Sequence, residues 1–358
     1  MTVQILTGDC RDLMRAMPEK SVQCVVTSPP YFGLRDYGVD GQIGLEPTPD
    51  EFVAAMIEVF REVRRVLKDD GTLWLNLGDS YAGSWGNYGG ANRGNGAQRA
   101  IVNGSVVKDQ TKRNGLYLPP TANVKGLKPK DLIGIPWRVA FALQADGWYL
   151  RQDIIWAKAN PMPESVRDRC TKAHEYIFLM SKSERYFYDS KAIAEPRHAP
   201  GNKSHKGTTA YEEGDDRHRT KAGLIAYAER QRALVSEDRK ALRSDIESRH
   251  RSSIPGGQSM QAEPDGTRNK RSVWSIATAP FSEAHFATFP PELPEICIKA
   301  GSREGDTILD PFGGAGTTGL VADRLGRNAI LTELNPEYAA MARRRIKGDA
   351  PMLAQVTA

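Results

Sequence analysis

The sequence predicts an α/β fold built around a largely parallel sheet, and three observations carry that prediction. Short apolar runs rich in β-branched residues, at 22–26 and 307–309, end at loops with polar and glycine-rich motifs. Amphipathic helical patterns separate these runs from their neighbours. A chain of 358 residues with 40% hydrophobic content is long enough for one large α/β domain with a substantial insert.

Each element of this sheet is predicted from apolar periods of two residues for strands and 3.6 residues for helices. In the first half of the chain, strands are predicted at residues 3–6, 22–26, 72–77, 149–157 and 174–181, and helices at 11–17, 49–67 and 132–145. Toward the C-terminus, strands are predicted at 307–309 and 329–332, with a helix from residue 317. Ligands bind at the carboxyl ends of the strands in such sheets, so the loops there form the candidate site.

Two stretches interrupt this pattern. Residues 82–130 turn to Gly, Asn and Ser and are predicted to form a mobile insert within the first part of the domain, residues 1–194. Residues 195–271 collect Arg, Lys and four of the six histidines, with a charged helix predicted at 221–249. A solvated surface is one interpretation of this stretch, and the one we adopt is a target-recognition region that contacts phosphates and base edges. Residues 272–350 then complete the domain, and 351–358 form a tail.

Composition argues against several classes of protein. The net charge of +5 at pH 7 and a pI of about 8.9 permit a polyanionic partner. No apolar run approaches the roughly 18 residues of a membrane span, and the first residues lack the pattern of a secretory signal, so we expect a cytoplasmic protein. The four cysteines show no CxxC spacing and the histidines no matching ligand pairs, so we expect neither disulfides nor a bound metal.

A glycine-rich motif follows the predicted strand 307–309. Asp310-Pro311-Phe312 ends the strand, and Gly313 to Gly319 form a turn whose backbone can approach a ligand with no Cβ in the way. Glu333 ends the next strand, about twenty residues later, where its carboxylate is placed to accept both ribose hydroxyls of an adenosine. The run Gly314-Ala315-Gly316-Thr317-Thr318-Gly319 also satisfies the GxGxxG pattern, which keeps NAD open as a cofactor. The carboxylate of Asp310 would repel a pyrophosphate but suits the ammonium of a methionine group, so we predict S-adenosylmethionine.

The motif Ser28-Pro29-Pro30-Tyr31 follows the predicted strand 22–26 and supplies a candidate chemistry. The exocyclic amine of adenine or cytosine is a poor nucleophile, because its lone pair is delocalised into the ring. Acceptors that hold both amine hydrogens let the nitrogen become tetrahedral, and the hydroxyl of Ser28 and the carbonyl of Pro29 are two such acceptors. The prolines stiffen the loop by fixing φ, and Tyr31 is placed to stack on the base. Such a loop cannot reach a base inside the duplex, so the base must first flip out.

Together these motifs resemble those of the β-class DNA amino-methyltransferases. In that family the amine-holding loop comes first, the recognition region second and the cofactor loop last, and this order matches over nearly the whole chain. The resemblance implies the Rossmann-like sheet of S-adenosylmethionine-dependent methyltransferases, in permuted motif order, with an inserted target-recognition region. It also implies that double-stranded DNA is the substrate and that the chain pairs as a homodimer.

The resemblance adds residues to the predicted cofactor site. Gly8-Asp9-Cys10 is similar to the family segment whose Asp contacts the cofactor's adenine, and residues 285–290 are similar to the segment that precedes the glycine loop. The predicted cofactor site therefore comprises Asp9, Cys10, His285, Phe289, Asp310, Pro311, Phe312, Gly314, Gly316, Thr317, Thr318, Glu333 and Leu334.

The predicted target base also follows from the resemblance. A serine at the first motif position is usual in N4-cytosine enzymes, whereas most adenine enzymes carry Asp or Asn there. The stretch 27–38 resembles stand-alone and prophage-type members, in which adenine modification is frequent, so we predict N6 of adenine, with N4 of cytosine as the alternative. C5-cytosine chemistry uses a thiolate in a Pro-Cys dipeptide, and no cysteine here follows a proline. Two other classes stay open, an NAD-dependent oxidoreductase and a non-catalytic DNA-binding module.

Overall fold

The computed structural model divides the chain into two compact units. The first comprises Met1–Ile193 and Asn269–Ala358, and the second comprises Ala194–Arg268. The residues that the structure describes are 1–82, 99–102, 105–108, 126–196, 266–279, 288–349 and 355–357.

The described part of the second unit is a short antiparallel pair. β8 (Glu195–Pro196) pairs with β9 (Thr267–Arg268), and Arg268 Nη2 lies 3.3 Å from Glu195 Oε2. The charged helix predicted at 221–249 and most of the insert predicted at 82–130 lie outside the described residues. The recognition role of the one stretch and the mobility of the other therefore stay predictions.

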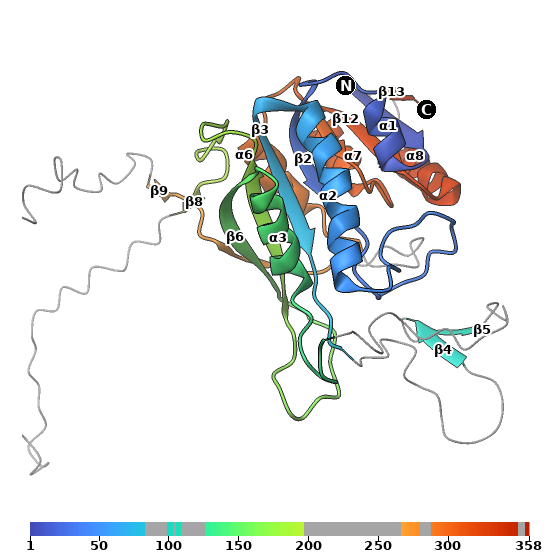
Figure 1. Ribbon diagram of the computed structural model, residues 1–358. Coiled ribbons are helices and arrows are strands. Elements are labelled where there is room, and N and C mark those ends of the chain that lie inside the picture. Colours follow the sequence, from blue (N-terminus) through green and yellow to red (C-terminus); the bar gives the residue numbers. More distant parts are fainter. Residues whose placement is uncertain are drawn as a thin grey trace, which may run out of the picture. The chain divides into compact units, whose positions relative to one another are not determined.

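The first unit is built on a nine-stranded mixed sheet with the order β10-β6-β7-β3-β2-β11-β12-β1-β13 (Figure 1). Neighbouring strands run parallel, except that β7 is antiparallel to both β3 and β6. The strands of this sheet are β1 (Thr2–Thr7), β2 (Val22–Thr27), β3 (Leu67–Leu77), β6 (Tyr149–Lys158), β7 (His174–Ser181), β10 (Val273–Ile276), β11 (Thr307–Asp310), β12 (Asn328–Glu333) and β13 (Gln355–Thr357). A separate hairpin consists of β4 (Arg99–Val102) and β5 (Ser105–Lys108).

This topology brings loops that are far apart in the sequence to one edge of the sheet. The carboxyl ends of β1, β2, β3, β11 and β12 lie at this edge, because these strands are mutually parallel. The first residues after these strands are Gly8, Ser28, Gly78, Pro311 and Leu334. Because β7 runs in the opposite direction, it brings its amino end, with His174 and Glu175, to the same edge.

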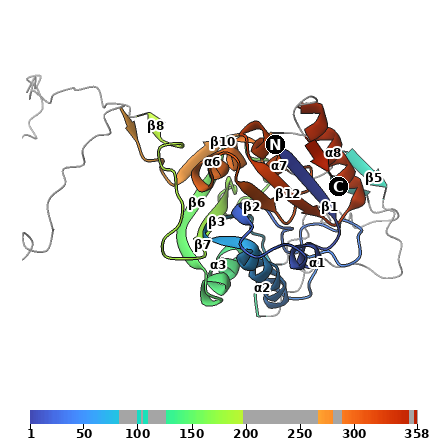
Figure 2. The same cartoon turned by 90° about the horizontal axis from the view of Figure 1, so that it is seen from above.

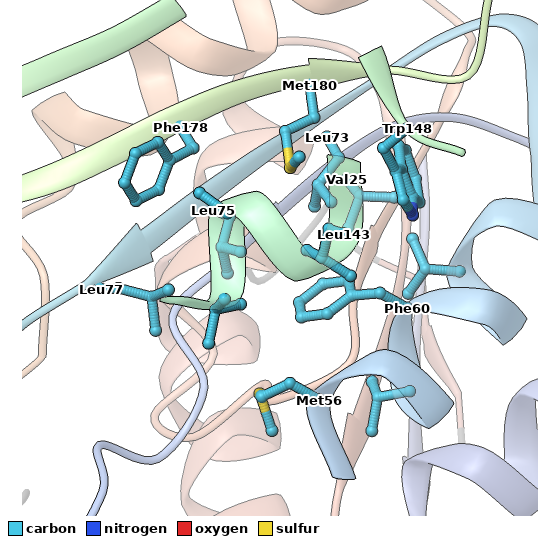
Figure 3. Close-up of a cluster of buried hydrophobic side chains, with 14 of the residues drawn as sticks. Val25, Met56, Phe60, Leu73, Leu75, Leu77, Leu143, Trp148, Phe178 and Met180 are labelled. Carbon is cyan, nitrogen blue, oxygen red and sulfur yellow. The ribbon is translucent and has the colours of Figure 1, made fainter. Parts of the chain in front are cut away.

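Helices cover both faces of the sheet (Figure 2). One face is covered by α1 (Cys10–Arg15), α2 (Pro49–Val66) and α3 (Ile135–Ala145), and the other by α6 (Glu292–Gly301), α7 (Thr317–Arg324) and α8 (Pro336–Asp349). Each layer buries a large apolar cluster against the sheet. Figure 3 draws the first cluster, in which Met56 and Phe60 of α2 lie with Leu73 and Leu75 of β3. Burying one such side chain contributes roughly 1.5–3 kcal/mol.

α2 is the longest helix among the described residues, and it forms where the sequence predicts a helix. Its N-cap is Thr48, whose hydroxyl accepts a hydrogen bond from the backbone N–H of Glu51, and Pro49 follows in the first turn. Apolar residues three and four apart, including Phe52, Met56 and Val63, form its buried face. The other residues of α2 are largely charged. No helix in the described ranges has both the length and the apolarity needed to cross a membrane.

The strands that carry the two motifs are enclosed on both sides. Every residue of β2 is buried, and so are the last three residues of β11. A near-continuous apolar run is the pattern of a parallel strand covered by helices on both faces. The strands predicted at 22–26 and 307–309 are therefore confirmed.

Other elements differ from the prediction. β3 begins at Leu67 rather than at Thr72, because the chain passes directly from α2 into an extended conformation. The charged residues at 68–70 conceal this start, and the pairing with β2 is irregular between Val22 and Cys24. Residues 351–358, predicted to be a tail, include β13, which pairs with β1. A strand of three residues is too short to show a period in the sequence.

Candidate active site

A cavity of about 860 Å³ lies along the carboxyl edge of the sheet. It is lined by residues from both motifs and from the loops after β1, β3 and β12. Among the predicted site residues, those that line it are Asp9, Cys10, Ser28, Pro29, Pro30, Tyr31, Phe289, Asp310, Pro311, Phe312, Gly314, Thr317, Glu333 and Leu334. Gly316 and Thr318 do not line it, and His285 lies outside the described residues.

Gly316 has a structural role behind the cavity wall. It is the N-cap of α7, with a left-handed φ of 77° that disfavours any residue with a Cβ. A Cβ built at this position would lie 2.8 Å from the Cβ of Ala342 in α8. Glycine at 316 therefore allows the turn and the close packing of α7 against α8.

Glu333 holds the glycine loop against the end of β12. Its Oε2 accepts a hydrogen bond of 2.8 Å from the N–H of Gly314, and its Oε1 accepts one of 2.8 Å from the N–H of Asn335. Burial raises the pKa of Glu333, although these backbone hydrogen bonds oppose the shift. Each carboxylate oxygen has a second lone pair, so the group can still accept ligand hydroxyls.

Asp310 is the buried junction between the two motifs. Its Oδ1 accepts from Thr27 Oγ1 at 2.7 Å, and its Oδ2 accepts from Thr318 Oγ1 at 2.6 Å. Burial raises its pKa, and the hydroxyl donors of Thr318 and Thr27 counteract that shift. Asp310 thus ties the end of β2, one residue before Ser28, to the start of α7. Its predicted role as the partner of the cofactor's ammonium stays a prediction.

Removing one donor to Asp310 should destabilise the protein. We expect Thr27→Val to lower the free energy of unfolding by about 1.5–3 kcal/mol, because a buried carboxylate loses a hydrogen bond. Chemical unfolding followed by circular dichroism measures the change. Thr27→Ser is the matched control, since it keeps the hydroxyl. Equal stability of the valine variant and the wild type would show that this bond contributes little.

The residues after β1 form a capped helix start. Asp9 is the N-cap of α1, and its carboxylate accepts a hydrogen bond of 2.8 Å from the backbone N–H of Arg11. The same carboxylate lies 2.6 Å from the guanidinium of Arg11, and the hydrogen bonds from that side chain lower the pKa of Asp9. Burial raises the pKa of the Cys10 thiol to about 12, which makes it a poor nucleophile. The predicted contacts of both residues with a cofactor stay predictions.

The loop after β2 places Ser28 and Tyr31 beside one another. Ser28 Oγ donates to Tyr31 Oη over 3.4 Å, and Tyr31 Oη donates to Glu175 Oε2 over 2.6 Å. Burial, with the neighbouring Glu175, raises the pKa of Tyr31. The phenol therefore keeps its proton at neutral pH and acts as a hydrogen-bond donor.

The absence of a side chain at Gly78 leaves room for the Tyr31 ring. A Cβ built on Gly78 would lie 2.4 Å from Cε2 and 2.9 Å from Cδ2 of Tyr31. We expect Gly78→Ala to displace the ring and to reduce turnover by about 100-fold, the cost of a misplacement near 1 Å, with cofactor affinity unchanged. Steady-state kinetics and calorimetry measure these two quantities.

Gly348→Ala is the control for this substitution, because a Cβ built there meets no atom within 4 Å apart from the adjoining residues and backbone of its own helix, α8. Wild-type turnover in the Gly78 variant would mean that the ring can move without loss.

Several polar residues of the cavity did not emerge from the sequence motifs. Lys158 ends β6, Glu175 lies near the start of β7, and Lys172 donates from Nζ to the backbone oxygen of Asp79 at 2.9 Å. Burial lowers the pKa of Lys172. The strand at 174–181 was predicted, but only the antiparallel direction of β7 brings its first residues to this edge. Among the described residues, no group of three or more His, Cys, Asp or Glu side chains could hold a metal ion.

The residues that line the cavity fall into two chemically different groups, which we call its two parts. In the first, Glu333 holds the glycine loop, and with the apolar Phe289 and Phe312 these residues offer backbone, carboxylate and ring surfaces, which suit an adenosine with an attached amino acid. In the second, hydrogen bonds and an ion pair join Ser28, Tyr31, Glu175 and Lys158. The arrangement can hold a cofactor and a second, planar polar substrate in one space.

Comparisons with known proteins agree with this arrangement. The chain matches the model of the N6/N4 DNA methylase family over residues 22–344. It is 42% identical to the Type II methyltransferase M.SmaI of Serratia marcescens over 346 residues, which cover 96% of this chain and 90% of the relative. It is 41% identical to the Type II methyltransferase M.XycI of Xanthomonas campestris pv. cyanopsidis over 354 residues, which cover 99% of this chain and 91% of the relative.

Two solved structures have a similar fold. The putative DNA modification methylase TTHA0409 from Thermus thermophilus, complexed with S-adenosyl-L-methionine, has a TM-score of 0.53 at 22% identity, covering 99% of this chain and 98% of its own. The cytosine-N4-specific PvuII DNA methyltransferase has a TM-score of 0.55 at 18% identity, covering 99% of this chain and 96% of its own. The predicted Rossmann-like methyltransferase fold is thus confirmed. The family uses S-adenosylmethionine, which removes the NAD-dependent alternative. The chain belongs to the N6/N4 family of S-adenosylmethionine-dependent DNA methyltransferases.

Proposed function

We propose that this protein methylates N4 of cytosine at a specific sequence in duplex DNA, with N6 of adenine as the second candidate. The observation that carries this choice is Ser28, which occupies the first position of the amine-holding motif and lines the cavity. A serine at that position is usual in N4-cytosine enzymes. The preference for adenine came from a resemblance to stand-alone and prophage-type members. We give that resemblance less weight, because the relatives named above are Type II methyltransferases rather than stand-alone enzymes.

The chain's own residues prepare the amine for reaction. In this proposal Ser28 Oγ and the carbonyl of Pro29 accept the two amine hydrogens, which lets the nitrogen become tetrahedral and withdraws its lone pair from the π system of the ring. The ring of Tyr31 stacks on the flipped base and offsets part of the few kcal/mol that flipping costs. The product amine loses its proton readily once it is positively charged, so no strong base is required beforehand.

The cofactor part of the cavity supplies the second half of the reaction. S-adenosylmethionine, when bound, offers a methyl group on a positively charged sulfur. In this proposal Glu333 accepts the ribose hydroxyls, the backbone of the glycine loop borders the ligand, and the carboxylate of Asp310 faces the amino acid part. Asp9 also lines the cavity, and the family resemblance assigns it to the cofactor's adenine.

Recognition of DNA and pairing of subunits complete the proposal. We assign target recognition to residues 195–271, on the basis of their basic composition and their place between the two motifs. Homodimerisation follows from the family resemblance, and light scattering of the purified protein tests it. A bacterial cytoplasm, where DNA is accessible, is the expected location.

The target base is tested by the product. The protein is incubated with duplex DNA of varied sequence and S-adenosylmethionine, and the nucleosides are identified by mass spectrometry after digestion. We expect N4-methylcytosine. N6-methyladenine would reverse the choice of base, and unmodified DNA, with cofactor binding verified, would favour the non-catalytic DNA-binding module.

A further inference from the structure

A chain of hydrogen bonds runs from the loop after β2 to a half-buried ion pair between Glu175 and Lys158. Ser28 Oγ donates to Tyr31 Oη over 3.4 Å, and Tyr31 Oη donates to Glu175 Oε2 over 2.6 Å. The other oxygen of Glu175 lies 2.5 Å from the ammonium of Lys158. Asn76 supports the Glu175 end of this hydrogen-bond chain, because its Nδ2 donates to Glu175 Oε2 over 3.2 Å.

The topology of the sheet creates this chain. Lys158 is the last residue of β6, and Glu175 pairs with Trp156 of the same strand. Because β7 is antiparallel to both neighbours, Glu175 lies between the carboxyl ends of β6 and β3. The side chains of Glu175 and Lys158 are only 13% and 23% exposed, so solvent weakens their interaction less than it would at the surface.

The carboxylate of Glu175, paired with Lys158, fixes which group donates in each hydrogen bond that leads to Ser28. The phenol oxygen has two acceptors nearby, Glu175 Oε2 at 2.6 Å and Asn76 Oδ1 at 3.3 Å. A carboxylate can only accept, and a short hydrogen bond to a charged oxygen is the stronger one, so Tyr31 donates its one hydrogen to Glu175. The phenol oxygen is then left to accept the hydrogen of Ser28. With its hydrogen committed, Ser28 presents lone pairs, which are what an amine N–H requires. The Ser28–Tyr31 bond is long here, and catalytic hydrogen bonds often tighten only in the substrate complex.

We propose that Glu175, held by Lys158, is a positioning residue that orients the Ser28 hydroxyl as a hydrogen-bond acceptor for the target amine. The inference rests on the proposed function, in which Ser28 holds that amine. Glu175 acts through Tyr31, without touching the reacting atoms. A serine in the same loop without this chain would be free to donate its hydrogen toward the amine, which is unproductive.

The substitution Glu175→Gln tests the direction of the chain. Lys158 attracts the amide oxygen of the new side chain, so its NH₂ faces Tyr31 and donates to the phenol. Tyr31 can then donate to Ser28, which reverses the chain. We expect kcat to fall by about 100-fold, comparable to the loss of an oriented catalytic hydrogen bond, with KM for DNA and affinity for S-adenosylhomocysteine unchanged. Glu62→Gln is the matched control, because Glu62 forms an ion pair of 2.8 Å with Arg65 on α2, away from the cavity.

A double-mutant cycle separates orientation from general damage. In a Tyr31→Phe background the chain no longer reaches Ser28, so adding Glu175→Gln should cause no further loss of kcat. An equal loss in both backgrounds, or wild-type kcat in the single variant, would overturn the inference. If the wild type itself forms no methylated base, the proposed function fails instead, so the two failures are distinguishable.

Discussion

Replacing Ser28 with alanine is expected to reduce the turnover of methyl transfer by about 100-fold or more, while S-adenosylmethionine binds as it does to the wild type. Alanine cannot accept a hydrogen from the target amine, so the nitrogen lone pair stays delocalised in the ring. Cofactor affinity should not change, because the residues that border the cofactor part of the cavity come from other strands. Single-turnover kinetics with labelled cofactor measure the first effect, and calorimetry with S-adenosylhomocysteine measures the second.

Ser21→Ala is the matched control for this experiment. Ser21 immediately precedes β2, whereas Ser28 immediately follows it, so the two serines lie at opposite ends of one strand. The hydroxyl of Ser21 donates to the backbone oxygen of Pro18. We expect the control to turn over like the wild type. A Ser28 variant that loses cofactor affinity and turnover equally would contradict the division of the cavity into two parts.

The second large effect is expected at Glu333. Glu333→Ala should weaken binding of S-adenosylhomocysteine by about 10- to 100-fold, because hydrogen bonds to a carboxylate contribute about 1.5–3 kcal/mol each. The variant also removes the acceptor that holds the N–H of Gly314, so the glycine loop loses its anchor. Calorimetry measures the affinity directly.

Glu337→Ala controls for the loss of a negative charge in the same region, since Glu337 is an exposed residue in the first turn of α8. Its affinity should equal that of the wild type. If Glu333→Ala also binds normally, the carboxylate serves only the backbone of Gly314 and Asn335, and the assignment of the ribose contact is wrong.

The sequence predicts those parts of the fold that have a strong local pattern. β2 and β11 are predicted because enclosed strands need continuous apolar runs. α2 is predicted because its apolar residues recur at helical spacing. The capping threonine and the proline in the first turn, seen in the structure, agree with that pattern. The two motifs follow these strands directly, so their positions at the sheet edge could be predicted too.

The residues that the sequence does not reveal depend on strand direction and long-range contacts. Glu175 and Lys158 reach the cavity only because β7 is antiparallel to β6 and β3, and nothing in the residues of a strand states its direction. The bonds from Thr27 and Thr318 to Asp310 are likewise invisible in the sequence. They give Asp310 a structural role besides its predicted contact with the cofactor.

The most direct test of the account is transfer of a labelled methyl group from S-adenosylmethionine to duplex DNA by the wild-type protein. One cavity that holds both a cofactor and a flipped base predicts that the label appears on the DNA and is recovered as N4-methylcytosine. Protein that binds S-adenosylmethionine and DNA, yet leaves the label entirely on the cofactor with DNA of varied sequence, would contradict the account.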